Sequence, residues 1–88
     1  MRAMRITYTS KFAREYKKLS KKVKLQAEKN EAIFRANPFD PALETHKLHG
    51  RLKDFWSFSI GFRFRVIFEF AGKDTVYFHS VGDHDIYQ

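Results

Sequence analysis

The last six residues, Asp83-His84-Asp85-Ile86-Tyr87-Gln88, contain two side chains suited to proton transfer and substrate contact. The imidazole of His84 can give or accept a proton near neutral pH, and the phenol of Tyr87 can donate a hydrogen bond or stack on a nucleobase. Both follow the apolar run 76–81 and Gly82, which we expect to end a strand. Side chains just past a strand end can converge on a pocket, whereas a chain terminus can also lack any fixed role.

Two arginines, Arg63 and Arg65, stand in the apolar segment before this one. On alternate positions of a strand they would point to the same side, about 7 Å apart. A guanidinium group is planar, permanently charged and able to donate two parallel hydrogen bonds to phosphate oxygens. Together with His84 and Tyr87 the pair predicts a site for an RNA phosphodiester, although an arginine on a half-buried sheet can also serve only as a solvated surface group.

The segment between Ala42 and Asp54 is polar, and we expect it to be an irregular loop. Its basic side chains are His46, Lys47, His49, Arg51 and Lys53. Long loops in compact domains are often functional, so we expect contacts to phosphate or base here, with a solvated basic loop as the alternative. The three-residue spacing of the two histidines could hold a metal on a helix, but the segment is loop-like and the chain has no cysteine. No zinc set is complete, and we expect no metal site.

Hydrophobic periodicity indicates the elements that must position these side chains. Strands are expected at residues 2–9, 55–60, 62–70 and 76–81, and helices at 10–19 and 20–37. Thr9 or Ser10 can cap the first helix and Ser20 the second. The order β-α-α-β-β-β predicts an α+β fold, in which a helical hairpin packs on one face of a mostly antiparallel sheet.

Alternation within the two long strands predicts which side chains face the helices. In the segment 62–70 the covered face should be Phe62, Phe64, Val66, Phe68 and Phe70. The other face, with Arg63, Arg65, Ile67 and Glu69, should stay open. In the last strand, Val76, Phe78 and Ser80 should point opposite to Tyr77, His79 and Val81.

Size and charge restrict the class of protein. Eighty-eight residues are expected to form one domain, 1–88. Seventeen Lys and Arg against ten Asp and Glu give a net charge of +7, which attracts polyanions such as nucleic acid or an acidic protein. We expect no membrane segment, no secretory signal and a cytoplasmic location, which the lack of cysteine suits. The sequence has no P-loop, GxGxxG, GxSxG or HExxH motif.

Several short motifs occur in the order typical of one family of small proteins. They are Asn37-Pro38-Phe39, Lys47-Leu48-His49-Gly50, Trp56-Ser57, Phe64-Arg65-Val66-Ile67-Phe68 and Ser80-Val81-Gly82-Asp83-His84. Over nearly its whole length the chain resembles the RelE/ParE superfamily of bacterial toxins from type II toxin–antitoxin systems. It looks most similar to the RelE-type endoribonucleases, which include the YoeB- and YafQ-like branches.

The resemblance implies an activity and partners. It implies cleavage of mRNA in the ribosomal A site, without a metal or other cofactor, by attack of a ribose 2′-hydroxyl on the adjacent phosphate. An acidic or amphipathic antitoxin is the implied protein partner, in a toxin–antitoxin hetero-oligomer. By matched position, Arg65 would stabilise the transition-state charge, His84 would be the general acid, and Tyr87 would stack on or orient the substrate. His46 would be the base or a phosphate contact, and Arg51 and Lys53 would hold the RNA backbone.

The chain departs from the family pattern where the base is concerned. Ser57 and Ser59 stand near the positions of the family's paired lysines. The carboxylate base of the YoeB-like branch has only Glu44 as its nearest counterpart, and the second histidine of the YafQ-like set is absent. The base therefore stays open. A different function on the same fold would be that of a ParE-like inhibitor, which binds DNA gyrase and does no chemistry, or of an inactive relative that only binds an antitoxin.

Overall fold

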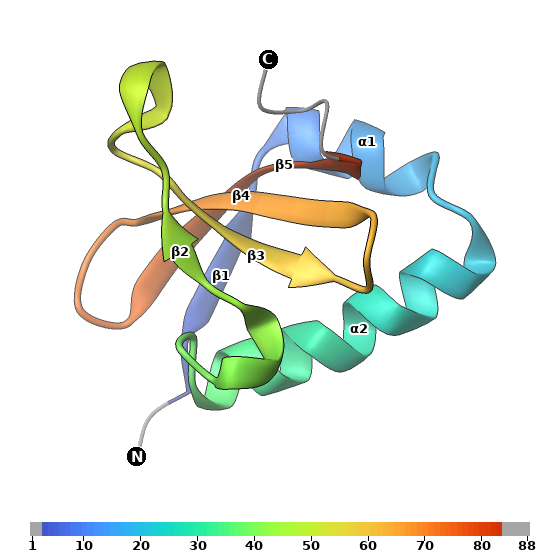
Figure 1. Ribbon diagram of the computed structural model, residues 1–88, viewed down its shortest axis with the longest axis horizontal. Helices are drawn as coiled ribbons and strands as arrows, with labels where there is room; N and C mark the ends of the chain where they lie inside the picture. Colours follow the sequence, from blue (N-terminus) through green and yellow to red (C-terminus); the bar gives the residue numbers. More distant parts are fainter. Residues whose placement is uncertain (1–2, 84–88) are drawn as a thin grey trace.

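A five-stranded sheet carries two helices in the computed structural model, which describes residues 3–83 (Figure 1). The elements are β1 (Arg5–Tyr8), α1 (Ser10–Lys17), α2 (Lys21–Ala36), β2 (His46–Lys47), β3 (Trp56–Ile60), β4 (Phe64–Phe70) and β5 (Thr75–Asp83). Two short 3₁₀ turns, Pro41–Leu43 and Gly50–Leu52, flank β2. The strand order is β1-β5-β4-β3-β2, with β1 parallel to β5 and all other pairs antiparallel. The predicted α+β class and helical hairpin are confirmed.

Local sequence signals explain where the helices begin and end. The hydroxyl of Thr9 accepts a hydrogen bond from the Phe12 amide at 3.1 Å, and that of Ser20 accepts one from the Val23 amide at 3.2 Å. Each serves as an N-cap, as expected, because the first amides of a helix lack partners within it. Helix α2 stops one residue before Asn37, whose extended backbone suits the following proline.

The core lies between α2 and one face of the sheet, and it is built from phenylalanines. Phe34 of α2 is fully buried, and its ring centroid lies 5.0, 4.9 and 5.3 Å from those of Phe58, Phe68 and Phe78. Each such aromatic pair contributes about 0.5–1.5 kcal/mol beyond the burial of its area. Helix α2 thus covers the phenylalanine-rich face (Figure 1).

Helix α1 has a different position, along the edge of β5. Strand β1 pairs with β5 only as far as Phe78, and α1 continues beside the second half of β5 (Figure 1). The carboxylate of Glu15 accepts hydrogen bonds from the Val81 amide at 3.1 Å and the Ser80 hydroxyl at 2.8 Å. Helix α1 therefore satisfies a strand edge that would otherwise leave its backbone groups unpaired.

Strand β5 corrects two expectations. It runs through Gly82, which pairs with Arg65, and reaches Asp83. The strand register shifts inside β5. Ser80 stands opposite Ile67 and Phe78 stands opposite Phe68, so the intervening His79 stands directly opposite no residue of β4. Such a bulge inverts the alternation of the residues after it.

The bulge changes which side chain reaches the core. Val81, rather than the expected Ser80, joins the hydrophobic core, where it stands opposite Val66. The hydroxyl of Ser80 is also buried, but it is bonded to Glu15. The prediction for this strand is therefore correct before residue 79 and wrong after it.

Strand β4 begins at Phe64, two residues later than expected. Ile60 pairs with Phe64, which leaves Gly61, Phe62 and Arg63 as a three-residue turn. Gly61 has φ 63°, a left-handed conformation that a three-residue hairpin loop commonly contains and that glycine adopts without steric cost. Phe62 is 95% exposed and outside the core, and Arg63 does not alternate with Arg65 within a strand.

The expected irregular segment contains a strand, β2, that pairs with β3 and makes the sheet five-stranded. The buried side chains of Leu43 and Leu48 anchor the segment on either side of β2. The second face of the sheet is also less open than expected, because Ile67 is only 5% exposed. The ring of Phe55 lies 5.0 Å from that of His79, so it reaches across β4 on this face.

Candidate active site

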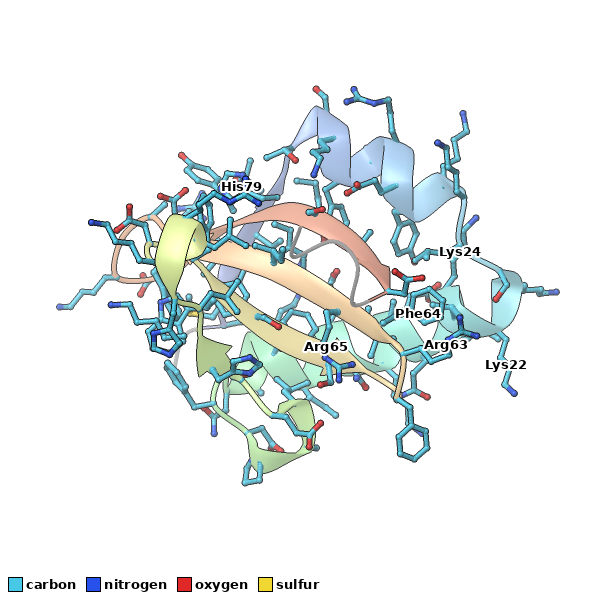
Figure 2. The ribbon with its side chains drawn as sticks, turned by 45° about the horizontal axis from the view of Figure 1, so that its top comes forward. Lys22, Lys24, Arg63, Phe64, Arg65 and His79 are labelled. Atoms are coloured by element: carbon cyan, nitrogen blue, oxygen red, sulfur yellow. The ribbon has the colours of Figure 1, made fainter. Side chains whose placement is uncertain are left out.

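Arg65 lies half-buried on the sheet face away from α2 (Figure 2). Its Nη1 donates to the carbonyl oxygens of Phe62 at 3.1 Å and Phe64 at 2.9 Å, which fixes the plane of the guanidinium. Within residues 3–83, the Nε and Nη2 groups have no hydrogen-bond partner. Three of the five N–H donors of this side chain therefore have no partner among the described residues, and a guanidinium N–H of this kind can bind an anion.

A carboxylate is bonded to the strand partner of this arginine. Ser59 is the register partner of Arg65 on β3, and its hydroxyl donates to Oε1 of Glu44 at 3.1 Å. Side chains directly opposite each other on neighbouring strands have Cβ atoms about 4.5–5.5 Å apart. A single serine side chain thus connects the Glu44 carboxylate to the position of Arg65.

Ser59 is held from both sides of the sheet. It is 5% exposed, and its carbonyl oxygen accepts a 2.7 Å hydrogen bond from the buried amide Nδ2 of Asn30 in α2. Gln26 donates in turn to Oδ1 of Asn30 at 2.9 Å. Asn30 therefore fixes the backbone of Ser59 from the core side, and the Ser59 side chain orients Glu44 on the outer side.

Glu44 itself has an unusual backbone. It ends the 3₁₀ turn Pro41–Leu43 with φ 52° and ψ 41°, the left-handed region. Few residues other than glycine adopt this conformation, and strained residues with useful side chains concentrate at functional sites. From its sequence position Glu44 was only the nearest counterpart of a family carboxylate, and the structure bonds it to Ser59, the strand partner of Arg65.

His46 is exposed on β2 and is bonded to the same segment. Its Nδ1 lies 3.0 Å from the carbonyl oxygen of Glu44. A carbonyl oxygen only accepts, so this contact assigns the proton of a neutral imidazole to Nδ1 and leaves Nε2 as a lone-pair acceptor. His46 pairs with Ser57, two residues from Ser59 on β3, so it shares the face of Arg65.

The remaining predicted RNA contacts lie further along the molecule. Lys47, His49, Arg51 and Lys53 are exposed, and they belong to the segment that leads into the start of β3 (Figure 1). Arg65 stands instead opposite Ser59, near the end of β3, and the three residues from Trp56 to Ser59 span about 10 Å of strand. The structure therefore brings Glu44 and His46 toward Arg65, and it separates Arg51 and Lys53 from it.

Arg63 is also separated from Arg65. It projects from the turn after β3, on the side of Lys22 at the start of α2, whereas Arg65 lies over the sheet (Figure 2). The expectation of two arginines pointing the same way about 7 Å apart is wrong, because β4 begins between them.

A histidine–carboxylate pair on the same face was not singled out from the sequence. Nε2 of His79 lies 2.8 Å from Oε1 of Glu69, and the rings of Phe55 and Tyr77 lie 5.0 and 6.2 Å from the imidazole. Alternation placed both residues on this face, but only the strand register shows that they meet. The pair stands at the end of the face that also carries the basic loop.

His84 and Tyr87, predicted as acid and stacking residue, lie outside the described residues. Strand β5 is described as far as Asp83, which pairs with Phe64, the neighbour of Arg65. In the part of the chain that is described, no three His, Cys, Asp or Glu side chains gather to hold a metal ion. Neither described helix has the length and apolar character needed to cross a membrane.

A separate hollow of about 500 Å³ lies between the two helices, away from Arg65. The hydroxyl of Tyr8 donates to Oε2 of Glu31 at 2.8 Å on its rim. Burial, and then the hydrogen bond and negative charge of Glu31, raise the pKa of Tyr8 above its ordinary value of 10.0. Burial likewise raises the pKa of Tyr16. Both phenols are therefore protonated at neutral pH, and the hydrogen bond of Tyr8 links β1 to α2.

Comparison with known proteins identifies the fold. No protein-family model matches the chain, and no curated protein matches it in sequence. A YoeB/ParE toxin from Agrobacterium tumefaciens superposes with a TM-score of 0.78 at 15% identity, over 92% of this chain and 99% of that one.

Two toxin–antitoxin complexes contain chains of the same fold. The RelBE2 complex of Mycobacterium tuberculosis gives a TM-score of 0.77 at 15% identity, covering 96% of this chain and 100% of that chain. The DinJ–YafQ complex of E. coli gives 0.76 at 15% identity, with 96% of both chains covered. At these identities the likeness shows that the chain has the RelE-like fold, and it leaves the activity to be argued from the residues.

Proposed function

We propose that this chain is the toxin of a type II toxin–antitoxin system and that it cleaves mRNA on the ribosome. The observation that carries the proposal is that Ser59, the strand partner of Arg65, holds the carboxylate of Glu44 through its hydroxyl. A cation and a base at one place are what transesterification of an RNA phosphodiester requires. The RelE-like fold supports the same reading.

The reaction would proceed without an added cofactor. The base accepts the proton of the ribose 2′-hydroxyl, and its oxygen attacks the neighbouring phosphorus. The bond from phosphorus to the 5′-oxygen breaks, and an acid protonates that oxygen. The products are a 2′,3′-cyclic phosphate and a free 5′-hydroxyl, so no electrons are exchanged and one proton passes from nucleophile to leaving group.

Arg65 would stabilise the charge that develops on the non-bridging oxygens. Its Nη1 is already bound to two carbonyl oxygens, so the guanidinium is oriented before the substrate arrives. Preorganised donors of this kind are worth about 10²–10³ in rate each. His84 remains the proposed acid and Tyr87 the proposed stacking residue.

Two side chains compete for the role of base. Glu44 has its carboxylate oriented by Ser59, and His46 has its Nδ1 directed to the Glu44 carbonyl. We assign the base to Glu44, because the serine that orients it is the direct partner of Arg65. His46 would then contact the substrate phosphate.

An acidic antitoxin is the proposed protein partner. A net charge of +7 favours an acidic segment, and two chains of the same fold are known in toxin–antitoxin complexes. Association should weaken as salt is added, because exposed charges are screened. An affinity independent of salt would contradict this electrostatic argument.

The decisive experiment is to map the 5′ ends of cellular mRNA after a short pulse of expression. We expect new ends within translated frames for the wild-type chain and none for the Arg65→Ala variant at equal protein level. Intact mRNA together with trapped gyrase–DNA breaks would refute the nuclease and support a gyrase inhibitor, which the YoeB/ParE likeness also allows. Normal growth with intact mRNA would leave antitoxin binding as the retained activity.

A further inference from the structure

A second hollow lies at the tip of the molecule, between the start of α2 and the turn that joins β3 to β4. Its volume is about 350 Å³. Ile60, Val23 and Phe64 form an apolar floor, and the exposed side chains of Lys22 and Arg63 stand at its rim. Figure 2 shows Lys22, Arg63 and Phe64 together at this end of the sheet.

The turn also presents a phenylalanine that the fold does not use. Phe62 lines the hollow and is 95% exposed, so its ring contributes almost nothing to the core. An aromatic ring on a short hairpin turn is an apolar surface next to two cations. Isolated exposed apolar residues are ordinary on protein surfaces, but this one belongs to a hollow with charge of one sign.

The charge of this hollow distinguishes it from the other one. Its described lining has Lys22 and Arg63 and contains no acidic side chain. The hollow between the helices has Glu28 and Glu31 beside its lysines, so its charges are balanced. Of these two hollows, the tip is therefore the one whose described lining carries positive charge alone together with an exposed ring.

We propose that the tip is a second RNA contact, in which a nucleobase stacks on Phe62 while Lys22 and Arg63 bind the flanking phosphates. Unpaired bases stack on aromatic side chains whatever their identity, and cations alongside hold the backbone. An acidic peptide would use the two cations but would leave the ring unexplained. The site rests on the proposed function in that its ligand is RNA, yet Arg65 is not among the residues that line it, and the site takes no part in cleavage.

The first test measures binding of a fluorescent single-stranded RNA oligonucleotide to the full chain that carries Arg65→Ala, so that the RNA is not consumed. Phe62→Ala should weaken binding about 5- to 100-fold, the range for loss of one stacked base. Phe62→Leu, which keeps the apolar surface, should lose as much, and Phe62→Trp should retain affinity. Because Phe62 is exposed, these variants should fold as the parent does.

The second test uses salt. Lys22→Gln and Arg63→Gln should each reduce the slope of log affinity against log salt by about 0.7, the value for one lost single-strand phosphate contact. Lys73→Gln, in the turn at the opposite end of β4, changes the same charge and should leave the slope nearly unchanged. Equal slopes for all three variants, or undiminished binding by Phe62→Leu, would overturn the proposal.

A polyglutamate peptide serves as the competing ligand. If the tip substitutions weaken its binding and spare that of RNA, the hollow is an acidic-peptide site and the proposal is wrong. The results distinguish a failure of the tip site from a failure of the proposed nuclease function. A chain that binds RNA through Phe62 but never cleaves mRNA would refute the nuclease alone, and a chain that cleaves mRNA with a dispensable Phe62 would refute the tip alone.

Discussion

Replacing Glu44 by Gln separates chemistry from stability at the candidate active site. The amide keeps the size of the side chain, and its oxygen can still accept the hydrogen bond of the Ser59 hydroxyl. A neutral acceptor in place of a charged one should cost no more than about 1 kcal/mol of the free energy of unfolding. For a domain of this size that lowers Tm by about 4–8 °C.

The expected loss of rate is much larger. Removal of a general base costs about 10²–10⁴ in rate, which is about 2.7–5.5 kcal/mol of activation free energy at 1.36 kcal/mol per tenfold. A domain with about 5 kcal/mol of stability is still more than 99% folded after losing 1 kcal/mol. Unfolding therefore cannot account for such a loss of rate at 25 °C.

The assay is single-turnover cleavage of mRNA on programmed ribosomes, with protein in excess, so that the chemical step is observed. Ser59→Ala should slow cleavage less, by about tenfold, because the carboxylate remains but is no longer oriented. His46→Gln should mainly weaken substrate binding. If Glu44→Gln retains more than a third of the wild-type rate while His46→Gln loses 10² or more, the base is His46 and the assignment from the Ser59 contact is wrong.

Three further substitutions test other parts of the structure. Arg65→Lys should slow cleavage about 10²–10³-fold, because lysine lacks the planar guanidinium that binds two phosphate oxygens at once. Thermal melting should show a loss of no more than about 1 kcal/mol in the free energy of unfolding. A wild-type rate of cleavage would show that Arg65 has no part in the mechanism. Glu15→Ala should cost about 1–3 kcal/mol in urea unfolding, because it leaves the Val81 amide without its acceptor, and Glu15→Gln should cost less; equal losses would contradict the hydrogen-bond account. Tyr8→Phe tests the alkaline range: the pKa of Tyr8 is raised on folding, so its stabilising effect is complete below the ordinary value of 10.0 and is lost as pH rises through the folded pKa. The wild type should lose more stability than Tyr8→Phe between pH 9 and 11 in urea unfolding, and parallel losses would show that burial and Glu31 do not perturb the phenol.

Local interactions made the helices predictable. Thr9 and Ser20 cap amides three residues away, and Pro38 excludes the helical conformation from the residue before it. These effects act within a few residues, so a reader of the sequence can locate them. The phenylalanines at alternate positions likewise predicted the covered face of β4, and the excess of positive charge does not depend on the fold at all.

Strand pairing between distant residues determines which side chains meet at the candidate active site. Glu44 and Ser59 are fifteen residues apart, and they meet because β2 folds back on β3. Likewise His79 and Glu69, ten residues apart, meet because β5 pairs with β4 so that Tyr77 stands opposite Glu69. Strand register depends on the sum of many cross-strand contacts, and a single added residue reverses every side chain after it.

Arg63 and Arg65 show the same contrast between what the sequence predicts and what tertiary pairing determines. The sequence shows their types, their charge and their spacing, and these predicted an affinity for phosphate. Whether both belong to one site depended on where the β3–β4 hairpin turns, and the pairing of Ile60 with Phe64 puts Arg63 in the turn and Arg65 on the sheet. Composition determined the net positive charge of this protein, and tertiary pairing determined where each group lies, because the relative position of two distant side chains is a property of the packed chain.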